Sequence, residues 1–162
     1  MRTYRTLAAL ATIAVFASCS SSLDSLTASD IVGQWTAARE EASPTGSYSR
    51  QLTFSNDGHF VLEFRSYGVY QGQQADDLSS YSRTAGTFTV AGDRLSFDPE
   101  SLTTWDAFYG ASSPETVRTP YPYASFYDDA RYRVEGNTLT LDYTSYPADA
   151  PEVTRQLFQR AP

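Results

Sequence analysis

Residues 88–98 read Phe-Thr-Val-Ala-Gly-Asp-Arg-Leu-Ser-Phe-Asp, with apolar and polar side chains alternating on either side of Gly92-Asp93. A period of two places successive side chains on opposite faces of a strand, and Gly-Asp between two such runs is typical of a tight hairpin turn. Residues 132–142, Tyr-Arg-Val-Glu-Gly-Asn-Thr-Leu-Thr-Leu-Asp, repeat the pattern without a gap. The two stretches predict two similar hairpins, although shared turn chemistry alone would also produce the likeness.

The same period runs through the rest of the chain from Asp30 onward. Asn56-Asp57-Gly58 separates two further alternating runs, and Asp-Gly favours a hairpin turn because glycine tolerates a positive φ. No stretch of about eleven residues in this part has the 3.6-residue stripe of an amphipathic helix. We expect eight strands, at about 31–39, 48–55, 59–70, 84–90, 94–99, 130–135, 138–145 and 153–160.

Eight sequential antiparallel strands predict an all-β fold, of which an eight-stranded up-and-down antiparallel β-barrel is the most economical form. Closing the sheet pairs both of its edges and leaves an interior that side chains or one small ligand can fill. A two-sheet sandwich is the alternative. The absence of long crossovers between the expected strands favours the barrel.

The N-terminus has the organisation of an export signal. Arg2 and Arg5 precede an apolar run over residues 7–17, which ends just before Cys19. A membrane-spanning helix needs ~20 apolar residues, so a removable signal peptide over residues 1–18 is the better interpretation.

The residues that close this run, Phe16-Ala17-Ser18-Cys19, resemble the lipobox of bacterial lipoproteins, although that pattern prefers Leu where Phe16 stands. The resemblance implies that Cys19 becomes the acylated first residue of the mature chain, carrying palmitate or similar lipid. Three serines follow it, which favours a tether, here residues 19–29, over a buried thiol. We therefore expect a domain over residues 30–160, lipid-anchored in the cell envelope, with Ser20 pointing to the outer membrane of a bacterium.

The first expected strand opens with Gly33-Gln34-Trp35, which resembles the start of bacterial lipocalin-like domains and of calycins generally. Residues 50–60 are similar to the second and third strands of these domains. The resemblance implies that Gly33 lets the strand bend, that Trp35 plugs the closed end of the barrel, and that an arginine packs across the indole. Arg160 and Arg155 are the candidates, and Arg160 is preferred because it lies at the chain end; the alternative is that Trp35 is an ordinary buried tryptophan.

Composition excludes several classes of function. The chain has 12 Lys+Arg, all of them arginine, against 19 Asp+Glu, so the basic surface of a nucleic-acid-binding protein is absent. One cysteine and one histidine are too few for a disulfide framework or a zinc site. His59 follows a turn, and Asp76-Asp77 and Asp128-Asp129 lack the ligand spacing of a calcium loop. We expect a protein that is not an enzyme, with no metal and no cofactor.

Residues 100–128 form a long connection between the fifth and sixth expected strands. Structureless loops longer than ~12–15 residues are uncommon in compact domains and are often functional. In an up-and-down barrel this connection shares an end with residues 68–83 and with the turn near Tyr146, so we expect all three to line one mouth. The alternative is a lid that only caps the core. The aromatic candidates for ligand binding are Trp105, Tyr109, Tyr121, Tyr123, Phe126, Tyr127 and Tyr70.

Two arginines on expected strands are candidates for contact with an anion. Arg50 shares a face with Leu52 and Phe54, which leaves packing or anion binding open. Arg155 shares a face with Val153 and Leu157, a spacing similar to the last strand of fatty-acid-binding proteins, whose arginine meets a carboxylate. Arg155 is therefore a candidate ligand residue, and an outward arginine is the alternative.

These features predict a membrane-anchored, non-enzymatic lipocalin-like lipoprotein, a monomer, that binds a small apolar or amphipathic ligand. The alternative is a protein-interaction module with a filled barrel, such as a protease inhibitor or an envelope-assembly factor. The expected partners are membrane lipid through Cys19, and either a small hydrophobic ligand or an envelope protein. The packing of the barrel interior distinguishes the two functions.

Overall fold

The computed structural model describes residues 28–37, 40–41, 46–110, 113–147 and 150–162. The predicted signal peptide, Cys19 and most of the tether lie outside these residues. Within the described ranges, no helix is both long enough and apolar enough to cross a bilayer.

Strands make up nearly all of the regular structure in the described residues, and the two helical segments are a single turn each. In chain order the elements are α1 (Ala28–Ile31), β1 (Gly33–Thr36), β2 (Glu40–Glu41), β3 (Ser47–Phe54), β4 (His59–Tyr67), β5 (Leu78–Ala91), β6 (Arg94–Asp106), the 3-10 turn η1 (Ala107–Tyr109), β7 (Thr116–Arg118), β8 (Asp128–Glu135), β9 (Thr138–Ser145) and β10 (Glu152–Arg160).

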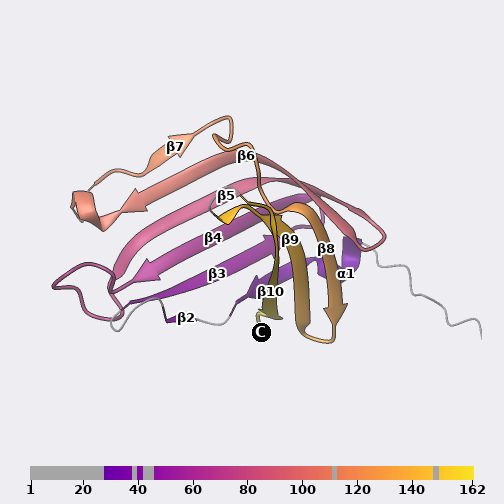
Figure 1. The fold of residues 1–162 in the computed structure, drawn as a ribbon, viewed down its shortest axis with the longest axis horizontal. Coiled ribbons are helices and arrows are strands. Elements are labelled where there is room, and N and C mark those ends of the chain that lie inside the picture. Colours follow the sequence, from indigo (N-terminus) through magenta and orange to yellow (C-terminus); the bar gives the residue numbers. More distant parts are fainter. Residues whose placement is uncertain (1–27, 38–39, 42–45, 111–112, 148–149) are drawn as a thin grey trace, which may run out of the picture.

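Eight of these strands form a closed antiparallel barrel in the order β1-β3-β4-β5-β6-β8-β9-β10, with β10 returning to β1. The two remaining strands extend the sheet locally, β2 beside β3 and β7 beside β6. Figure 1 shows β8, β9 and β10 running across the long curved sheet of β3 to β6. The predicted all-β, eight-stranded up-and-down barrel is confirmed.

The closing seams of the barrel are narrow. On one side β1 is only four residues long, and it joins β10 by placing Trp35 opposite Arg160. On the other side β6 meets β8 where Arg94 lies opposite Arg131, close to a hydrogen bond of 2.8 Å from the backbone N–H of Tyr132 to the carbonyl oxygen of Asp93. The barrel is therefore closed by few contacts at two places.

Two strands are longer than the sequence predicts. β5 begins at Leu78, where residue 84 was expected, and β6 runs to Asp106, where residue 99 was expected. Much of the expected loop 100–128 is therefore strand, because Thr103, Thr104 and Trp105 pair with β5 and suit an extended backbone. The two strands form a ribbon that runs beside β3 and β4 to the end of the sheet away from α1 (Figure 1).

The core gathers at the end of the barrel where β1 lies. Leu52 and Phe54 of β3 point into it at the predicted spacing of two, and large apolar side chains of the neighbouring strands meet them. The fully buried large side chains include Trp35, Phe54, Phe60, Phe158, Ile31, Leu52, Leu139 and Leu141.

Trp35 closes this end of the barrel. Its side chain is fully buried, and Nε1 donates a hydrogen bond of 2.7 Å to the carbonyl oxygen of Ile31 in α1. The guanidinium carbon of Arg160 lies 4.2 Å from the centroid of the indole. Arg160, and not Arg155, is the arginine that packs on the tryptophan, which is the geometry that the lipocalin-like resemblance implies.

Arg160 also connects β10 to the segment formed by α1 and Val32. Its two terminal nitrogens donate to the carbonyl oxygens of Val32 at 2.9 Å and Asp30 at 3.0 Å. Gly33 has a φ of 127°, and a Cβ there would lie 2.9 Å from Nη1 of Arg160. Glycine is needed at this position both for the backbone and for the space that the guanidinium takes.

Replacing Arg160 by Met should lower the free energy of unfolding by about 2–4 kcal/mol, because the cation–π contact and two hydrogen bonds to carbonyls are lost together. Urea denaturation followed by tryptophan fluorescence measures the change. Arg118→Met, at an exposed position of β7, is the control and should change the free energy by less than about 0.5 kcal/mol. Equal losses in the two variants would contradict the role of Arg160.

Candidate ligand-binding recess

Two aromatic side chains from the connection before β8 enter the barrel and fill its middle. Phe126 stacks on Phe60, with ring centroids 5.3 Å apart, and meets Phe97 edge-on at 5.5 Å. Tyr127 packs edge-on against Tyr143 at 4.2 Å. The pair therefore separates the packed core on the Trp35 side from the opposite end of the barrel.

The backbone that delivers these rings is in an uncommon conformation. Tyr127 has a φ of 49° and Asp129 a φ of 51°, in the left-handed region that few residues other than glycine adopt. Such residues cost of order 1–3 kcal/mol each and persist only where the surroundings hold them. Here the Asp128 carboxylate accepts a hydrogen bond of 3.2 Å from the Phe126 N–H, and the Tyr127 hydroxyl donates to the Gln156 side chain at 3.3 Å.

Beyond this pair the barrel is open. A recess of about 420 Å³ lies there, within the range of roughly 300–1,000 Å³ that small-molecule sites occupy. Its walls are mainly aromatic and aliphatic, with hydroxyl groups at intervals. The lining residues are Arg50, Leu62, Phe64, Ser125, Phe126, Tyr127, Tyr143, Thr144, Ser145 and Tyr146.

A second recess, of about 530 Å³, adjoins the first at the side of the barrel. It lies between β3 and β10, because β1 pairs with these strands only as far as Thr36 and they have no strand between them beyond it in the described part of the chain. The two recesses share Arg50, Tyr143 and Ser145. In the described residues, the first recess thus lies at the mouth of the barrel and the second at its side.

Arg50 lies where the two recesses meet. The period of two along β3 puts it on the inward face with Leu52 and Phe54, and its side chain is half-buried. The guanidinium carbon is 5.7 Å from the ring centroids of both Tyr48 and Phe64. Among the described residues, no carboxylate forms an ion pair with it.

Polar groups of β9 and β10 complete this end of the barrel. The hydroxyls of Ser145 and Thr154 lie 2.6 Å apart and share a hydrogen bond. The buried Gln156 side chain accepts a hydrogen bond from the Tyr127 hydroxyl. The recess therefore combines one cation, a few hydroxyls and apolar walls.

The predicted aromatic ligand residues fall into two separate groups. Tyr121, Tyr123, Phe126 and Tyr127 belong to the first, in which Tyr121 packs edge-on against Tyr123 at 5.5 Å and Phe126 at 5.7 Å. Of these, only Phe126 and Tyr127 line the recess, and Tyr123 is 60% exposed.

The second group lies at the far tip of the β5–β6 ribbon. The Tyr70 hydroxyl donates to Oδ1 of Asp106 at 2.7 Å, and its ring lies 5.8 Å from that of Phe108. Phe108 and Tyr109 are 72% and 78% exposed. Trp105, on β6 opposite Tyr81, is near this tip and lines neither recess at the open end.

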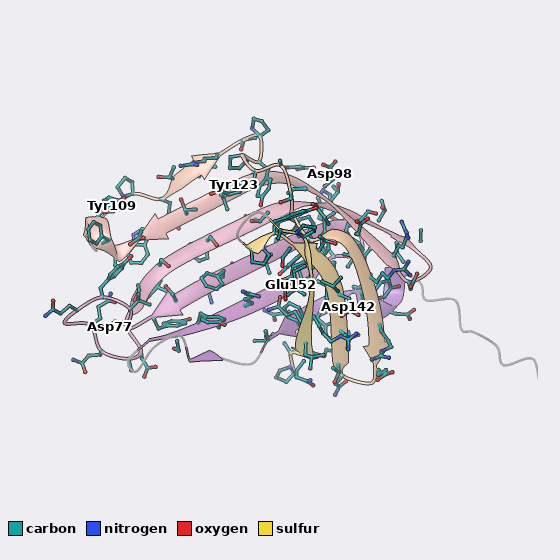
Figure 2. All side chains as sticks on the ribbon, in the orientation of Figure 1. Asp77, Asp98, Tyr109, Tyr123, Asp142 and Glu152 are labelled. Atoms are coloured by element: carbon teal, nitrogen blue, oxygen red, sulfur yellow. The ribbon has the colours of Figure 1, made fainter. Side chains whose placement is uncertain are left out.

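The prediction that all three connections line one mouth is therefore wrong in one respect. The turn near Tyr146 and the segment at Phe126 and Tyr127 do meet, but residues 68–83 line neither of the recesses. The physical reason is that β5 and β6, together with β3 and β4, continue past the recess, so the connections at their ends lie beyond it. Figure 2 shows the separation, with Tyr109 at the end of the ribbon and Tyr123 near its middle.

Arg155 lies on the outer face of the barrel. Gln156 and Phe158 take the inward positions of β10, so Arg155 and Leu157 are exposed. The guanidinium makes two hydrogen bonds to the Asp142 carboxylate, at 2.7 and 2.9 Å, and this contact holds the pKa of Asp142 below its usual range. The inward orientation proposed for Arg155 is thus corrected, and the outward alternative is the one observed.

Several lining residues were not among the predicted site residues. Phe64, Tyr143 and Ser145 reach the recess because their strands continue the inward alternation of Leu62 and Leu141 to the open end. That alternation was visible in the sequence, but it does not reveal where the packed core stops. In the described residues, no group of three His, Cys, Asp or Glu side chains is placed to hold a metal ion.

Comparison with known proteins places this chain in no family. No family model matches it. No curated protein matches it either. Among solved structures, the crystal structure of Rv2717c from M. tuberculosis aligns over 83% of this chain and 94% of its own, with 14% identity and a TM-score of 0.33. A likeness of this size carries no argument about function.

Burial between Tyr143 and the core raises the pKa of Tyr127 above the ordinary value of 10. A group whose pKa is higher in the folded than in the unfolded state stabilises the fold fully below pH 10 and loses this contribution as the pH rises further. Tyr127→Phe should therefore remove the last tyrosine to ionise in an alkaline absorbance titration and reduce the loss of stability above pH 10.

The control for this titration is Tyr123→Phe, which removes a tyrosine that is 60% exposed. It should leave the last ionisation step in place. If both variants keep that step, Tyr127 is not the tyrosine responsible for it.

Proposed function

We propose that this protein is a non-enzymatic, lipocalin-like binding protein that holds a small amphipathic ligand at the open end of its barrel. The observation that carries the proposal is the division of the interior. Phe126 and Tyr127 complete a packed core on one side, whereas the other side is left as a recess of about 420 Å³.

The chemistry of the walls supports a ligand with both apolar and polar parts. Leu62, Phe64 and Tyr143 offer apolar surface, and burying a ligand against such surface contributes roughly 25 cal/mol per Å². Arg50 and the hydroxyl of Ser145 stand beside them and give a polar group of the ligand a place to bind. A few polar groups among apolar walls are typical of small-molecule sites.

We also propose that Cys19 is acylated and attaches the domain to a membrane of the cell envelope. The proposal rests on the resemblance of residues 16–19 to a lipobox and on the serines that follow. Acyl chains on one cysteine would supply stable attachment without a membrane-spanning helix.

One observation favours the second candidate function, a module that binds another protein. Phe108 and Tyr109 are exposed side by side at the tip of the ribbon, with ring centroids 5.5 Å apart, and exposed aromatic residues are enriched at protein interfaces. This tip is remote from the recess, so ligand uptake distinguishes the two functions.

Filling the recess should abolish ligand uptake. Ser145 lines both recesses and is half-buried, so Ser145→Trp places an indole where the ligand would lie. We expect the wild-type protein to enhance the fluorescence of the neutral dye N-phenyl-1-naphthylamine and the variant to bind it about tenfold more weakly or worse.

The matched control is Thr89→Trp, which adds the same side chain at an exposed position of β5. It should bind the dye as the wild type does, and circular dichroism checks that both variants are folded. Absence of dye binding to the wild-type protein, or unchanged binding to Ser145→Trp, would overturn the recess as the binding site.

Acylation has its own test. Expressed from its full-length sequence in a bacterial host with labelled palmitate, the protein should incorporate label and fractionate with membranes, and Cys19→Ala should do neither. Cys19→Ala that remains membrane-bound, or a wild-type protein without label, would contradict the anchor. Ser21→Ala, next to the same segment, is the control and should behave as the wild type.

A further inference from the structure

We propose that Arg50 makes the recess selective for amphiphiles with an anionic head group, so that the ligand is an acid with an apolar body. This inference rests on the proposed binding function and adds to it the charge of the ligand. It is carried by the position of Arg50 at the junction of the two recesses, between aromatic rings.

The electrostatic setting of Arg50 is unusual in this chain. The protein has a net charge of −7, which repels anions from most of its surface. The lining of the two recesses, however, contains no Asp or Glu among the described residues. Asp128 interacts with the Tyr146 hydroxyl at the rim and lines neither recess.

Five other described arginines have partners. Arg65, Arg131, Arg133 and Arg155 are each paired with a carboxylate, and Arg160 donates to backbone carbonyls. Arg155 also lines the side recess, but its guanidinium is held by Asp142 on the outer face. Arg50 is therefore the one cation of the recess lining whose charge is not already matched by an acid in the described residues.

Among the described residues, Arg50 contacts aromatic rings, and its guanidinium donates no hydrogen bond to any of them. Its guanidinium carbon is 5.7 Å from the rings of Tyr48 and Phe64, and those rings lie 5.6 Å from each other. Aromatic neighbours hold a guanidinium by cation–π attraction without consuming its N–H groups. A carboxylate can then accept two parallel hydrogen bonds from the planar edge, an arrangement that lysine cannot offer.

The surroundings of Arg50 divide into a place for a head group and a place for an apolar body. The hydroxyls of Ser145 and Thr154 lie on the β9 and β10 side, where the second recess opens. Leu62, Phe64 and Phe126 form the walls of the first recess on the other side. An amphiphile with its acid at Arg50 would therefore bury its apolar part against the Phe126 and Tyr127 pair.

The test compares dodecanoate with its uncharged methyl ester, each as a competitor of N-phenyl-1-naphthylamine at pH 7.5. Wild-type protein should bind the acid at least about tenfold more tightly than the ester, as expected for a charge-assisted pair of hydrogen bonds. In Arg50→Gln this preference should disappear, so that the ratio of the affinities for acid and ester falls to about one at whatever affinity the variant has for the dye. Arg50→Lys should retain only part of the preference.

Arg155→Gln is the matched control, because Arg155 lines the side recess but faces outward and is paired with Asp142. This variant should prefer the acid over the ester as strongly as the wild-type protein does. Wild-type protein that binds acid and ester equally would overturn the inference without requiring any variant. Dye binding together with an unchanged preference in Arg50→Gln would overturn it too, while leaving the proposed function standing. Failure of the wild type to bind the dye or either competitor would instead remove the proposed function.

Discussion

The contact of Arg160 with Trp35 joins the last strand of the barrel to the first, and the closed architecture depends on it. β1 is four residues long, so its backbone pairing with β10 is brief and the side chains must supply the rest of the closure. The indole seals the end, and the guanidinium covers it while capping two carbonyls of the segment that leads into β1. Because the first and last strands of the barrel meet here, the intervening strands are held in one ring.

A barrel closed in this way still has to fill its interior, and the chain does so unevenly. Large side chains of β3, β4, β9 and β10 pack the end near Trp35, and Phe126 and Tyr127 cover the side of this core that faces the recess. The left-handed conformation of Tyr127 is held by neighbours that belong to the core. The close packing near Trp35 thus supports the fold, and the barrel interior beyond Phe126 and Tyr127 can remain open.

The fold could be read from the sequence because alternation with a period of two, interrupted by Gly-Asp, Gly-Asn and Asp-Gly, is a local signal. The length of β5 and β6 could not, since most residues in 78–84 and 100–106 are polar on both faces and the few apolar ones do not alternate regularly. That single difference moved Tyr70, Trp105 and Tyr109 away from the recess. Arg50 and Arg155 both lie on strands, and which face of a strand points inward depends on the strands beside it. The sequence therefore left an inward and an outward orientation open for each arginine, and the structure shows Arg50 inward and Arg155 outward.

The short helix α1 enters the barrel at the sealed end, where the carbonyl of Ile31 meets the indole of Trp35. Any attachment made through residues before Ala28 therefore joins the domain at the end of the barrel that Trp35 closes. The nine residues from 19 to 27 reach no more than about 30 Å even when extended. With Cys19 acylated as proposed, the recess would lie at the end of the barrel away from the attachment, so a ligand could reach it without passing between the domain and the bilayer.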